Sequence, residues 1–140
     1  MGQYYEGILQ LRNPSKDVFE FLKELVGERE KVNIVKEEKI ANGFDLYFDN
    51  QRYMISIGRK LQKRFGGELK ITRKLFTLNK ISGKRVYRVN VLFRLPSFKV
   101  GDVINFKGKE IKVKAIGNKI FGFEIDTGKK ISVAYKDIKI

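Results

Sequence analysis

The sequence predicts an α+β fold: a split βαβ (ferredoxin-like) antiparallel sheet with two helices on one face, followed by a small all-β barrel. The apolar periodicities of residues 1–95 indicate strand, helix, strand, strand, helix, strand and strand in order. Pro96 interrupts this pattern, because proline cannot donate to a β-ladder. Beyond it, turn signals recur about every ten residues without a helical period, which favours a small barrel. We therefore expect two domains, residues 1–95 and 96–140.

The first fifty residues are expected to form three strands and one helix. Ser15 is a suitable N-cap for the helix, and Gly27 is expected to end it. Asn42 and Gly43 predict a type I′ hairpin turn, since both residues tolerate positive backbone angles. The expected strands, identified by alternating apolar and polar side chains, are residues 4–12, a segment around 32–34, and residues 44–49.

The stretch 51–67 predicts an amphipathic helix. Its apolar residues fall within about 80° of one another on a helical projection, and its basic residues form an opposed stripe. The apolar set is Met54, Ile57, Leu61 and Phe65; the basic set is Arg52, Arg59 and Lys63, with Lys60 and Arg64 on its flank. Gly66 and Gly67 are expected to end the helix. Strands are predicted at 69–76 and 85–95, joined by a turn within 79–84.

The charge is concentrated in the middle of the chain. The net charge is +14, and it divides into −3 for residues 1–50, +12 for residues 51–95 and +5 for residues 96–140. Glu68 is the single acid of the middle segment. A field of one sign attracts polyanions, so nucleic acid is the leading partner and an anionic membrane surface the lesser one.

Composition removes several functional classes. Cysteine and histidine are absent, which removes disulfides, thiolate metal sites and the commonest general base. No apolar run approaches the ~20 residues of a membrane-spanning helix, and the N-terminus lacks a secretory signal pattern. We expect a cytoplasmic protein that is not an enzyme, without a cofactor, a metal, a membrane partner or a small-molecule substrate.

The candidate RNA-binding residues are the cations of the predicted second helix and the strands that follow it, together with one turn lysine. They are Arg52, Arg59, Lys60, Lys63, Arg64, Arg73, Lys74, Arg85, Arg88 and Lys119. Arginine suits this role because its planar guanidinium binds phosphate through two hydrogen bonds. Tyr4, Tyr47 and Tyr53 are candidate stacking platforms for unpaired bases, with ordinary packing as the alternative.

Two other functions remain open. Asp45 and Asp49 share one face of the predicted third strand, and paired carboxylates can hold Mg²⁺ in a nuclease. The alternative for these residues is the outward face of a half-buried strand. The basic surface could also belong to a protein-interaction module that docks acidic partners, such as a GTPase.

Four stretches resemble the archaeal members of the Nmd-three family, the large-ribosomal-subunit export adaptor of eukaryotes. They are YYEGILQLR at 4–12, SIGRKLQKRFGGELK at 56–70, TRKLF at 72–76 and YRVNVLFRLPSFKVGD at 87–102. The resemblance implies a protein that binds the large subunit and its ribosomal RNA late in assembly, with ribosomal proteins as further partners. It also implies that residues 98–140 are similar to one barrel of the region that looks like translation factor five-A, and their length favours the Src-homology-three-like type of barrel.

The chain departs from this family in one respect. Family members begin with zinc-binding Cys-x-x-Cys pairs, and this chain has no cysteine. The start at Met1-Gly2, directly before the similar region, favours a truncated chain over a divergent form. An archaeal member needs no nuclear export, so the resemblance implies subunit maturation, or control of the subunit's availability, and not the export role of the eukaryotic members.

Overall fold

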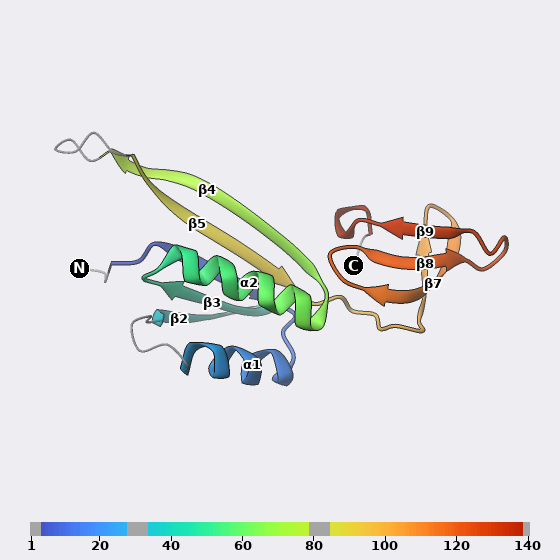
Figure 1. Ribbon diagram of the computed structural model, residues 1–140, viewed down its shortest axis with the longest axis horizontal. Coiled ribbons are helices and arrows are strands. Elements are labelled where there is room, and N and C mark those ends of the chain that lie inside the picture. The colour runs from blue at the N-terminus through green and yellow to red at the C-terminus, as the bar shows by residue number, and fades with distance from the viewer. Residues whose placement is uncertain (1–3, 28–33, 79–84, 139–140) are drawn as a thin grey trace.

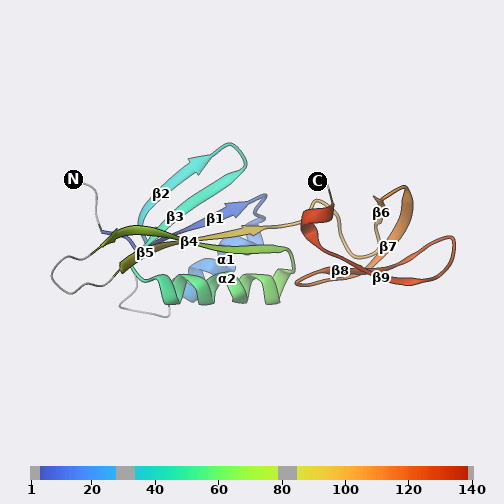
Figure 2. The same cartoon turned by 90° about the horizontal axis from the view of Figure 1, so that it is seen from above.

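The computed structural model describes residues 4–27, 34–78 and 85–138. A five-stranded sheet carries two helices on one face, and a separate four-stranded sheet follows it (Figures 1 and 2). The predicted α+β class is confirmed. The elements are β1 Gly7–Arg12, α1 Lys16–Gly27, β2 Ile34–Ile40, β3 Gly43–Phe48, α2 Gln51–Phe65, β4 Glu68–Leu78, β5 Arg85–Arg94, β6 Val103–Phe106, β7 Lys109–Ile116, β8 Ile120–Glu124, β9 Lys130–Val133 and the 3₁₀ turn η1 Tyr135–Asp137.

The first sheet differs from the predicted plan in the place of one strand. Its order is β2-β3-β1-β5-β4, and β1 runs parallel to β5 while all other neighbours are antiparallel. The prediction of a purely antiparallel sheet is therefore wrong, and the split βαβ plan is not confirmed. On that plan the strand after α2 would lie beside β1, but β4 lies at the edge and β5 comes between them.

Burial explains this order. Val89, Val91 and Phe93 of β5 are at most 1% exposed, whereas Leu69 and Ile71 of β4 are only partly buried. The more apolar strand takes the central position because apolar area removed from water stabilises the fold. The basic strand β4 is left at the edge, where charged side chains also discourage pairing with other chains.

The local signals of the first fifty residues are confirmed in part. The Ser15 hydroxyl accepts a hydrogen bond from the Val18 N–H at 3.3 Å, as expected of an N-cap. Between β2 and β3 the chain turns at Ala41 and Asn42, which confirms the predicted hairpin, but Asn42 lacks the positive φ of a type I′ turn, so the predicted turn type is wrong. A Cβ at position 43 would overlap a backbone carbonyl of β1. Gly43 therefore permits close strand packing instead of forming the turn.

The core of residues 4–95 lies between the helices and the sheet. Its most deeply buried large residues come from β1, α2, β3 and β5. They are Leu9, Leu11, Phe48, Met54, Ile57, Leu61 and Phe93, all at most 1% exposed. None of the helices in the described part of the chain is long and apolar enough to cross a membrane.

The second sheet is an antiparallel meander in the order β6-β7-β8-β9. Within residues 98–138 no pairing joins β6 to β9, so the predicted closed barrel is not confirmed. The inner face has its own small core, made of Ile111, Val113, Ile120, Val133 and Tyr135.

The second sheet touches the first region at the end of α2. The Gly67 N–H donates to the Gly117 carbonyl at 3.3 Å, and the Tyr135 hydroxyl donates to the same carbonyl at 2.5 Å. Burial raises the pKa of Tyr135 to about 12, against a smaller lowering by the Gly67 backbone. These contacts place the β7–β8 turn beside the C-terminal end of α2.

Candidate nucleic-acid interface

Helix α2 is fixed at both ends by hydrogen bonds. The Asn50 side chain accepts from the Tyr53 N–H at 3.0 Å, and Glu6 accepts from the Gln51 N–H at 2.8 Å. At the other end, Gly66 has a φ of 69° and its N–H donates to the Gln62 carbonyl at 2.8 Å. The predicted stop at Gly66 is confirmed, and the helix is held in one position by its caps.

One face of α2 packs closely on the sheet. A Cβ at position 58 would lie 2.7 Å from the Val91 side chain, so glycine lets the helix approach β5 directly. Met54, Ile57 and Leu61 of the same face are fully buried. The opposite face is therefore turned to solvent (Figure 2).

This solvent face carries the cations that the sequence predicts. We call Arg52, Arg59, Lys60 and Lys63 the α2 ridge; all four are exposed. Within the described residues no salt bridge within 4.0 Å includes any of them. Arg59 and Lys63 are four residues apart on the helix, so they repel one another at a cost of a few tenths of a kcal/mol. A bound polyanion would relieve this repulsion.

Arg64 lies on the flank of the ridge toward α1. Its guanidinium is 5.7 Å from the Phe21 ring, and it lines a hollow together with Asp17, Glu20 and Glu24. These carboxylates of α1 offset part of its positive field. Arg64 is therefore a weaker candidate for phosphate than the four ridge residues.

The strand cations are divided between the two faces of the sheet. Cross-strand partners share a face. Arg73 is opposite the buried Val89, so it lies on the helix side, whereas Lys74 is opposite Arg88 on the uncovered side. The Arg88 guanidinium lies 3.8 Å from the Tyr5 ring centroid and donates to the Tyr5 hydroxyl at 3.0 Å. The candidate cations of the strands therefore do not share one surface with the α2 cations, because alternation along β4 and β5 turns successive side chains to opposite faces.

The two remaining predicted cations lie at the start of a strand and in a turn. The Arg85 backbone begins β5, and its side chain falls outside the described part of the structure. Lys119 follows the Gly117 carbonyl that binds Gly67, so it belongs to a turn beside the end of α2. Lys119 is exposed in this turn of the second region.

The predicted stacking tyrosines are mostly occupied by other contacts. Tyr53 is 6% exposed and its hydroxyl donates to the Leu25 carbonyl, so the prediction of a platform there is wrong. Tyr47 donates to Glu38 at 3.2 Å and packs edge-on against Tyr5 at 4.9 Å. Tyr4 is exposed, and its hydrogen bond to Glu6 raises the pKa of its phenol.

The candidate nuclease carboxylates have other roles in part. The Arg12 guanidinium binds the Asp45 carboxylate at 2.9 Å, with both side chains largely buried. Among the described residues no group of three or more Asp or Glu side chains is placed to hold a metal ion. The arrangement gives the Mg²⁺ hypothesis no support.

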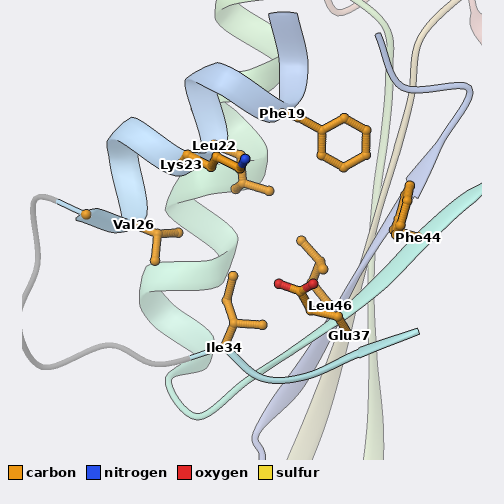
Figure 3. A pocket seen from close by; sticks show the side chains of 9 residues that line it. Phe19, Leu22, Lys23, Val26, Ile34, Glu37, Phe44 and Leu46 are labelled. Carbon is orange, nitrogen blue, oxygen red and sulfur yellow. The ribbon is translucent and has the colours of Figure 1, made fainter. Parts of the chain in front are cut away.

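An apolar groove of about 520 Å³ lies between α1 and the β2–β3 hairpin (Figure 3). Phe19 and Phe44 meet edge-on across it at 4.9 Å, with Lys23 and Glu37 at its rim. Its two walls are joined in the chain by residues 28–33, which lie outside the described part. We assign no ligand to it.

The sequence reasoning missed two aromatic features. The contact of Tyr5 with Arg88 joins residues far apart in the chain, and no local pattern marks it. The exposed Phe121 of β8 does have a local signal, because Phe121 and Phe123 alternate with Gly122. That alternation could have placed both rings on one face of a strand.

Comparison with known protein families matches residues 4–95 to the family described as NMD3, second domain. The match covers the five-stranded sheet, both helices and the whole α2 ridge. No curated protein matches the chain. Because the matched residues make up well over half of its length, the chain belongs to the NMD3 family.

Proposed function

We propose that this chain is a non-enzymatic, cytoplasmic ribosomal-RNA-binding factor that acts in biogenesis or late maturation of the large ribosomal subunit. Membership of the NMD3 family, which is generally associated with the ribosome, supports a ribosomal partner. The α2 ridge supports RNA as the component that is touched. No membrane and no small-molecule substrate enters the proposal.

The observation that carries the proposal is the unneutralised ridge on a rigid helix. The cations of α2 are exposed on a helix that is capped at both ends and packed on the sheet by its other face. Phosphate binding by such a ridge would be independent of base sequence, as expected for a protein that recognises the shape of folded RNA. Each neutralised phosphate would contribute about 0.7–0.9 to the slope of log affinity against log salt.

A charge-reversal variant tests the proposal directly. Arg52, Arg59 and Lys63 are replaced together by glutamate, and binding of the full chain to purified large subunits is measured by co-sedimentation across a salt series. We expect binding to fall at least about a hundredfold and the salt slope to become shallower by about two or more. Thermal unfolding should change little, because these side chains are exposed.

The matched control makes the same change of charge elsewhere. Lys16, Lys23 and Lys39 are exposed cations of α1 and β2, and their replacement by glutamate should leave affinity within about threefold of the unmodified chain. Equal losses in the two variants would mean that net charge, and not the ridge, governs binding. Unchanged binding in the ridge variant would contradict the proposal.

The alternative of an acidic protein partner predicts a different result. A module that docks a ribosome-associated GTPase would retain its partner after ribonuclease treatment, because protein contacts do not need the RNA. We expect the co-sedimenting material to be lost on such treatment. Retention of a protein partner without large-subunit components would favour the alternative.

A further inference from the structure

The outer face of the second sheet carries two phenylalanines among lysines. We call Lys112, Lys114, Phe121, Phe123, Lys130 and Ser132 the β8 face. Phe121 is 41% exposed and Phe123 is partly exposed, whereas their neighbour Ile120 is buried on the inner side. The inner side has its own core around Ile111 and Val113, so the two rings are not needed to fill it.

The register of the strands places the lysines around the rings. Lys112 and Lys130 are the cross-strand partners of Phe123 on either side, and Ser132 is the partner of Phe121. A β-bulge between Val113 and Ala115 leaves Lys114 outside the ladder. Such a bulge turns the extra residue's side chain away from the regular alternation of the strand. The Lys114 ammonium lies 5.4 Å from the Phe123 ring centroid.

These residues enclose a shallow hollow of about 580 Å³. Its lining includes Phe121, Phe123, Lys114, Lys130 and Ser132, and no carboxylate. Glu110 lies farther along β7, where its partner is Asn105 of β6. The hollow therefore combines aromatic surface with positive charge and one hydroxyl.

We propose that the β8 face binds single-stranded RNA through unstacked bases. Phenyl rings stack on the faces of bases without regard to sequence, and flanking ammonium groups neutralise the adjoining phosphates. Duplex RNA offers no free base faces, so its bases cannot stack on the phenyl rings. The charge of the face is complementary to a polyanion, and this argues for nucleic acid over an uncharged protein surface.

This site is separate from the function proposed above. It lies outside residues 4–95, which match the family, and it does not use the α2 ridge. The ridge presents charge alone to folded RNA, whereas the β8 face adds aromatic surface for unpaired nucleotides. Each site can therefore fail experimentally without the other.

Two substitutions at one position test the proposal. The affinity of the full chain for a short fluorescent oligouridylate is measured by anisotropy for Phe121→Leu and Phe121→Tyr. Leucine keeps the apolar volume and removes the π-face, so we expect binding about fivefold to a hundredfold weaker. Tyrosine keeps the π-face and should retain affinity within about twofold. Leucine binding as tightly as the unmodified chain would overturn the proposal.

Further measurements separate this site from the ridge and from duplex binding. The ratio of the tyrosine to the leucine affinity should persist when Arg52, Arg59 and Lys63 are glutamates, since those residues lie in the other region. A duplex RNA of equal length should show no difference between the two variants. Loss of this affinity ratio in the ridge variant, or an equal ratio for duplex RNA, would contradict a separate site for single-stranded RNA.

Discussion

The two regions of the molecule solve the packing of a sheet differently. In the described part of residues 4–95 two helices cover one face of the sheet, and the resulting core contains fourteen buried residues. In residues 98–138 no α-helix covers the four-stranded sheet, and the corresponding cluster contains five. Apolar burial is the main favourable term in folding, so the first region should supply most of the stability.

The difference also decides where each region can bind. A helix that buries one face can present a dense row of cations on the other, because the core already fixes its position. A sheet without a helical cover can instead leave aromatic side chains in contact with solvent, as Phe121 shows. The first region therefore offers charge on a rigid support, and the second offers π-surface.

The largest predicted effect comes from removing a buried ring of the first region. Phe93 of β5 is 1% exposed, and Phe93→Ala should lower the free energy of unfolding by about 3–5 kcal/mol. Urea denaturation followed by circular dichroism measures this loss. The control is Phe121→Ala in the second region, which should change stability by less than about 0.5 kcal/mol. Similar losses in both variants would remove the contrast between the regions.

The next effect tests the contact between the regions. Gly66 has a φ of 69° and lies against the Ile116 backbone, whereas Gly128 has a φ of 73° and open space around the Cβ position. Gly66 combines its φ with a ψ of 163°, a conformation almost confined to glycine, and the positive φ of Gly128 also disfavours a side chain, so alanine at either position costs about 1–3 kcal/mol in backbone strain. Only Gly66→Ala should also displace the β7–β8 turn, since its Cβ would collide there. We expect it to cost about 1 kcal/mol more than Gly128→Ala and to shift the amide NMR signals of Gly117 and Lys119. Equal costs, with unchanged signals, would contradict this contact.

The sequence predicts the elements of this fold better than their arrangement. Local signals such as the Ser15 cap, the Gly66 stop and the alternation in β5 depend on neighbours in the chain, and the structure confirms them. The order of strands depends on which of two adjacent strands buries more apolar area. That comparison involves the whole sheet, so the exchange of β4 and β5 was not predicted.

In the candidate site, too, local properties follow from the sequence and the arrangement of the elements does not. The exposure of the α2 cations follows from helical periodicity, which is a local property. The separation of Arg73 from Lys74 also follows from alternation, but the face that each occupies depends on where the helices pack. The contact of Tyr5 with Arg88 could not be read from the sequence, because only the parallel pairing of β1 and β5 brings them together.

The smallest predicted effect comes from Tyr135, the buried phenol of the second region. Its hydroxyl donates to the Gly117 carbonyl, which also accepts from Gly67 of the first region. Tyr135→Phe should cost only about 0.5–1.5 kcal/mol at neutral pH, because the carbonyl keeps the second donor. Tyr87→Phe, at an exposed position of β5, is the control and should be neutral.

The pH dependence of stability gives this prediction its specific signature. Burial raises the pKa of Tyr135 from 10.0 to about 12, so between these values the folded state retains a proton that the unfolded state releases. Stability from this group is complete below pH 10 and is lost as the pH rises toward about 12. Tyr135→Phe should therefore flatten the alkaline decline in melting temperature, whereas Tyr87→Phe should leave it unchanged. An alkaline decline of equal steepness in both variants would mean that Tyr135 ionises as readily in the folded chain as in the unfolded one. The contact between the regions would then not shield its hydroxyl from water.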